Sequence, residues 1–65
     1  MNVVWMRHRR SAIGHAFAET DVTARLDPLV PIMNCDRYAF QDVLRDELAE
    51  RCRACDHAVR KLARQ

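Results

Sequence analysis

Apolar residues recur at helical spacing along the second half of the chain. Between residues 36 and 63 they fall three or four positions apart, and neither Gly nor Pro interrupts them. Asn34 or Asp36 can cap the first turn of a helix here. The stripe consists of Phe40, Leu44, Leu48, Cys52, Cys55, Val59 and Leu62. Its spacing predicts one long amphipathic helix, which fills a C-terminal segment of residues 35–65.

The first half of the chain shows shorter patterns. Residues 1–10 begin with the apolar run Val3–Met6 and continue into bases, which indicates an extended arm. Residues 11–34 are expected to form short helices and loops: Ser11 can cap one short helix, and Pro28 can occupy the first position of another.

These patterns together predict an all-α fold, a helical hairpin within a single small domain over residues 1–65. The chain has 65 residues, of which 49% are hydrophobic and 6% aromatic, with one Gly and two Pro. Too few turn residues are present for a β-sandwich or barrel. A core this small does not enclose a conventional substrate cleft. We therefore expect no catalytic activity, except as an accessory subunit that completes a partner's active site.

A helix of about 28 residues is roughly 42 Å long, which exceeds the diameter of a compact domain of this size. The remaining apolar residues are too few to cover it, so we expect a protein partner or a homo-oligomer. The function that this predicts is a non-catalytic protein–protein interaction module, either a self-associating helical protein or a small accessory subunit of a larger complex. Trp5 is either an anchor of this interface or part of the chain's own core. The residues predicted for the interface are Val3, Val4, Trp5, Phe17, Phe40, Leu44, Leu48, Val59 and Leu62.

Charge is unevenly distributed although the net charge is only +2. Residues 1–18 carry three arginines and no acid, residues 19–50 carry eight acids against three arginines, and residues 51–65 carry five bases against one acid. An alternative function is therefore a small dimeric nucleic-acid-binding regulator that uses a basic N-terminal arm. Its phosphate contacts would be made by Arg7, Arg9 and Arg10.

A Cys-x-x-Cys pair, Cys52 and Cys55, is followed by His57, and a third cysteine stands at position 35. Cysteine and histidine are the preferred ligands of structural zinc, so a second alternative is a zinc-stabilised helical module with Cys35, Cys52, Cys55 and His57 as ligands. The competing interpretation is that both paired cysteines are small apolar members of the helical stripe. A pair inside a long helix also argues against thioredoxin-like redox chemistry. His15 is interpreted as a residue of a solvent-facing helix surface.

The longest apolar run, Val3–Met6, has four residues, where a membrane span needs about twenty. The run precedes the bases instead of following them, unlike a secretory signal. An odd number of cysteines, three, also argues against a disulfide framework. We expect a cytoplasmic protein without a membrane partner.

Overall fold

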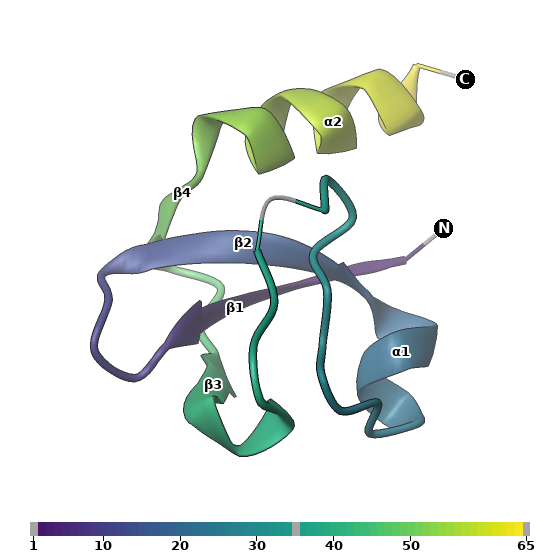
Figure 1. Ribbon diagram of the computed structural model, residues 1–65. Helices are drawn as coiled ribbons and strands as arrows, with labels where there is room; N and C mark the ends of the chain where they lie inside the picture. Colours follow the sequence, from purple (N-terminus) through teal and green to yellow (C-terminus); the bar gives the residue numbers. More distant parts are fainter. Residues whose placement is uncertain (1, 35, 65) are drawn as a thin grey trace.

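The computed structural model describes residues 2–34 and 36–64 and shows a four-stranded sheet with a helix on each face (Figure 1). The strands are β1 (Val3–His8), β2 (Ile13–Ala18), β3 (Val43–Arg45) and β4 (Glu50–Arg51). The helices are α1 (Glu19–Thr23), the 3-10 helix η1 (Phe40–Asp42) and α2 (Arg53–Ala63). The all-α prediction is therefore wrong, and the protein is a mixed α/β domain.

Strand order across the sheet is β3-β1-β2-β4. β1 and β2 form an antiparallel hairpin in which Trp5 lies opposite Ala16. β3 adds antiparallel to β1, and the short β4 adds parallel to the start of β2. The hairpin thus forms the centre of the sheet.

The apolar run at the N-terminus is an inner strand, not an arm. β1 has a strand partner on each side, and its residues Val4, Trp5 and Met6 are all buried. A strand that is covered on both faces has a continuous apolar sequence instead of an alternating one. Val3 and Val4 also have the β-branched side chains that favour strands.

Side chains alternate between two cores, one on each face of the sheet. The first core lies under α1 and the segment that leads to η1, and it consists of Val4, Met6, Phe17, Leu29 and Val43. The second core lies under α2 and consists of Trp5, Ala16 and Cys55, with Val3, Ile32, Cys52 and Val59 packed at its margin. Burial on both faces is what gives so short a chain a stable sheet.

The prediction of a single long C-terminal helix is also wrong, because α2 begins only at Arg53. Phe40 lies in η1, Leu44 lies in β3, and Leu48 lies in the turn before β4 with 97% of its surface exposed. Their spacing of four residues matches one face of a helix only by coincidence, because three different local structures present these side chains. A helical hairpin is therefore excluded.

Neither predicted short helix forms. Residues 13–18 are β2, because pairing with β1 buries Ala16 and Phe17 on opposite faces, and α1 begins only at Glu19. Leu29 exchanges two backbone hydrogen bonds with Tyr38, so the segment after Pro28 is extended at that point. Cross-strand pairing has overridden the local capping signals in both places.

One ion pair joins the central hairpin to the turn after β3. The Nε of Arg7 donates a hydrogen bond of 2.8 Å to Asp46 Oδ2, and both side chains are about 30% exposed or less. The hydrogen bond from Arg7 lowers the pKa of the Asp46 carboxyl, and a backbone hydrogen bond from Leu48 adds to the effect. The charged carboxylate is therefore favoured in the folded state.

Replacing Arg7 with glutamine should lower the thermal midpoint more near neutral pH than at about pH 2. A depressed carboxyl pKa contributes stability above the unfolded value, and this contribution is lost as the pH falls through the folded value. Thermal melts of both proteins across the acid range measure the difference. Arg45→Gln, which breaks the more exposed pair with Glu47, is the matched control and should have a smaller effect. Arg7 also donates to the backbone carbonyls of His8, Arg9 and Ser11, which do not titrate, so a deficit of equal size at both pH values would contradict the assignment.

Candidate metal centre

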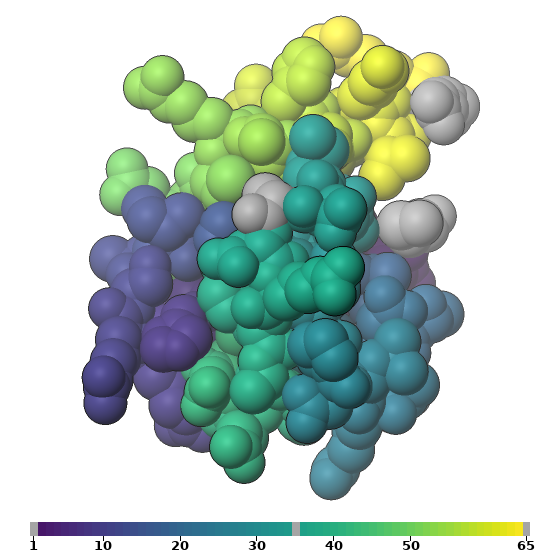
Figure 2. All heavy atoms as spheres, viewed as in Figure 1, coloured from purple at the N-terminus to yellow at the C-terminus, as the bar shows by residue number. Residues whose placement is uncertain are grey.

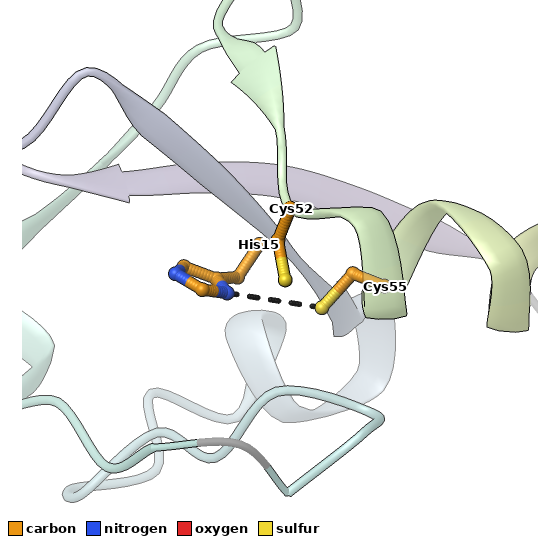
Figure 3. Close-up of side chains that lie close together, drawn as sticks. All are labelled: His15, Cys52 and Cys55. Carbon is orange, nitrogen blue, oxygen red and sulfur yellow. Dashed lines mark hydrogen bonds between the residues drawn. The ribbon is translucent and has the colours of Figure 1, made fainter.

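Three metal-ligating side chains converge where α2 leaves the sheet. His15 comes from β2, Cys52 is the residue that caps α2, and Cys55 lies in the first turn of that helix (Figure 3). Their ligand atoms all lie within 4.8 Å of one another. Figure 3 shows both sulfur atoms directed toward the imidazole ring of His15.

The spacing of these atoms suits tetrahedral zinc. Zinc–sulfur bonds of about 2.3 Å and zinc–nitrogen bonds of about 2.0 Å place neighbouring ligand atoms roughly 3.5 to 3.8 Å apart. The Sγ of Cys55 lies 3.8 Å from Nδ1 of His15. The remaining separations are at most 4.8 Å, so movements of the ligand atoms by about 1 Å would bring them into the same range.

Backbone hydrogen bonds hold the two cysteines beside β2. The amide of Cys52 donates to the carbonyl of Gly14 at 2.8 Å, which continues the pairing of β4 with β2. The carbonyl of Cys52 then accepts the amide of Asp56 as the first hydrogen bond of α2. The Cys-x-x-Cys pair therefore lies on a strand-to-helix turn, not within a long helix as predicted.

Burial differs among the three ligands. Cys55 is fully buried against the second core, whereas His15 and Cys52 are half-buried. Burial lowers the pKa of His15, and the negative charge of Asp36 partly opposes this effect. Burial therefore favours the neutral imidazole, which is the form that binds a metal ion.

Of the four predicted ligands, Cys52 and Cys55 lie together in the structure. The histidine beside them is His15 instead of the predicted His57. His57 is exposed on the outer side of α2 and is not part of the cluster. Cys35 lies outside the described residues, so its role as a ligand stays a prediction. His15 was missed because residues 13–18 were interpreted as a helix, and no local signal links it to a cysteine 40 positions away.

The predicted interface residues occupy very different environments. Val4, Trp5 and Phe17 are buried in the chain's own two cores, and Phe40 packs against the first core. Leu44 is half-buried and Leu48 is exposed. Val3, Val59 and Leu62 border a surface hollow of about 850 Å³ beside Trp5 and Arg51.

The three arginines predicted to bind nucleic acid lie at the end of β1 and in the hairpin turn. Arg7 is bound to Asp46, and the Nε of Arg9 donates to the carbonyl of Gln41 at 3.0 Å. Arg10 is exposed. Two of these three guanidinium groups are therefore engaged within the chain.

Comparison with known proteins gives no relative. The chain matches no protein-family model, no curated protein and no solved structure. Among the described residues, no helix is both long and apolar enough to cross a bilayer. Any function proposed for the site therefore depends on its geometry and chemistry.

Proposed function

We propose that the protein is a small non-catalytic interaction module that a zinc ion stabilises. The observation that carries this proposal is the convergence of His15 with Cys52 and Cys55 from a position 40 residues away. The chemical types of the three ligands favour zinc, which takes both thiolate and imidazole.

The ion would connect α2 to the sheet. Only Cys55 of α2 is fully buried, and the helix and its N-cap otherwise meet the second core through the half-buried Val59 and Cys52. A 65-residue chain buries a small core, and domains of this size often depend on a metal or a disulfide. Structural zinc contributes an apparent binding free energy of about 10 to 16 kcal/mol in small zinc-binding peptides. A zinc ion at this position would therefore make docking of α2 largely metal-dependent.

The hollow beside Trp5 is the candidate partner surface. The hollow bordered by Val3, Val59 and Leu62 is partly apolar. Arg51 and Trp5 also line it, and the guanidinium of Arg51 lies over the Trp5 ring, 4.4 Å from its centre. Leu62 is exposed and Val3 and Val59 are half-buried, and an aliphatic surface beside an arginine is typical of protein interfaces. This hollow supports the interaction role, since the predicted overlong helix no longer does.

Metal titration tests the zinc proposal. Reduced, chelator-treated protein should bind about one equivalent of Co²⁺ with the visible absorption of tetrahedral cobalt–thiolate coordination, and Zn²⁺ should displace it. His57→Ala is the matched control, because this histidine lies near the cysteines in sequence but outside the cluster, and it should bind equally well. Absence of cobalt–thiolate absorption in the reduced protein would refute the proposal.

A further inference from the structure

One exposed arc of α2 contains only basic side chains. At about 100° of rotation per residue, five positions fall within an arc of roughly 100° on this helix and its C-terminal cap. They are Arg53, His57, Arg60, Lys61 and Arg64. No acidic or apolar side chain falls within the same arc, which we call the basic face.

The basic face lies opposite the side of α2 that packs on the sheet. Cys55 is about 180° from the centre of the arc and is fully buried, while all five basic side chains are exposed. α2 lies along one end of the molecule, and its side chains form the upper surface in Figure 2. The acidic helix α1, with Glu19 and Asp21, lies at the other end (Figure 1).

Most charges of the basic face are not neutralised within the chain. Asp56, the acid within α2, lies outside the arc and accepts ion pairs from Arg51 at 3.7 Å and Arg60 at 3.2 Å. Within residues 2–34 and 36–64, no carboxylate forms an ion pair with Arg53, Lys61 or Arg64. These three cations are available to an external anion.

The composition of the face indicates which anion it would bind. Protein interfaces have an apolar core and are depleted of charge at their centre, whereas this arc contains no apolar side chain. Contacts with nucleic acid are made mainly by arginine and lysine to phosphate oxygens. His57, Arg60, Lys61 and Arg64 also border a hollow of about 330 Å³, which is large enough for a phosphate group.

We propose that the basic face of α2 binds the phosphate backbone of double-helical nucleic acid. The five side chains extend over about 16 Å of helix axis, across which one strand presents about five phosphates. An exposed α-helix is also narrow enough to enter a DNA major groove of about 12 Å. The proposal uses none of the zinc ligands, and it places binding on α2 instead of on Arg7, Arg9 and Arg10.

Fluorescence anisotropy with labelled duplexes longer than one helical turn tests the proposal. The probes are a DNA duplex, an RNA duplex, single-stranded DNA and polyglutamate. Duplex affinity should fall with salt, with a slope of about −3 for log K against log salt if three phosphates are contacted. Binding to polyglutamate as tight as to either duplex would instead indicate an acidic protein partner and overturn the proposal.

Two variants of equal charge locate the site. Arg53→Gln/Lys61→Gln/Arg64→Gln removes three cations from the basic face, and it should weaken duplex binding at least about tenfold and remove most of the salt slope. Arg10→Gln/Arg25→Gln/Arg37→Gln removes three exposed cations elsewhere and should change affinity less than about threefold.

An equal loss of duplex affinity in both triple variants would overturn the assignment to α2, and so would salt-independent binding in the unmodified protein. Absence of duplex binding would do so as well. Because a triple substitution can disturb the helix, circular dichroism is recorded for each protein. The single variants Arg53→Gln, Lys61→Gln and Arg64→Gln should each reduce the slope by about one.

Discussion

Replacing Cys55 with serine should abolish zinc-dependent stabilisation of this protein. A ligand present at a thousandfold its dissociation constant stabilises the folded state by about 4 kcal/mol. For a domain of this size, that corresponds to a difference in thermal midpoint of roughly 20 °C. The unmodified protein should therefore melt about 20 °C higher with zinc than with chelator, whereas Cys55→Ser should melt at one temperature in both buffers.

The difference in thermal midpoint between the zinc buffer and the chelator buffer is the quantity to compare, because serine at the buried position 55 also alters packing. His15→Ala and Cys52→Ser should lose the difference, and His57→Ala should retain it in full. Cys35→Ser tests the ligand that only the sequence predicts. A difference that survives in both Cys55→Ser and His15→Ala would show that these residues do not hold the metal.

Replacing Phe17 with alanine should unfold the protein. Phe17 has none of its surface exposed and packs in the first core with Val4 and Leu29. Removal of a buried phenylalanine side chain typically costs 3 to 5 kcal/mol, which is comparable to the total stability expected of so small a domain. Loss of the far-ultraviolet circular dichroism signal and of dispersed amide resonances would measure this result.

Leu48→Ala is the matched control for the fold as a whole. On a long helix, Leu48 would be central to the apolar stripe and its truncation would cost as much as that of other core residues. In the structure its side chain is 97% exposed, so the free energy of unfolding should change by less than about 0.5 kcal/mol. A large decrease in the free energy of unfolding for Leu48→Ala, together with a small decrease for Phe17→Ala, would contradict the sheet structure described above.

The sequence by itself determined features that depend on local chemistry. Cys55, Val59 and Leu62 are spaced three or four residues apart, and the segment that holds them is helical. Cys52 and Cys55 are candidate ligands from their residue types alone, and they do lie within one cluster with a histidine. The concentration of bases after residue 50 is likewise plain from the sequence, and α2 places it on one face.

Only the tertiary structure decided which segments are strands. A short apolar run such as Val3–Met6 is compatible with an arm, a buried helix or an inner strand, because periodicity does not distinguish them over four residues. Pairing of this run with residues 13–18 and 43–45 makes it an inner strand. Strand pairing joins distant parts of the chain, so the spacing of apolar residues within one segment does not predict it.

The arrangement of the candidate metal ligands was decided in the same way. His57 is two residues from Cys55, yet helical rotation carries it to the opposite side of α2 from the buried sulfur. His15 is 40 residues away, yet the pairing of β4 with β2 brings it within 3.8 Å of the Cys55 Sγ. Residue type therefore marked Cys52 and Cys55 as candidate ligands from the sequence, whereas the position of each side chain in the cluster was fixed by hydrogen bonds between distant segments.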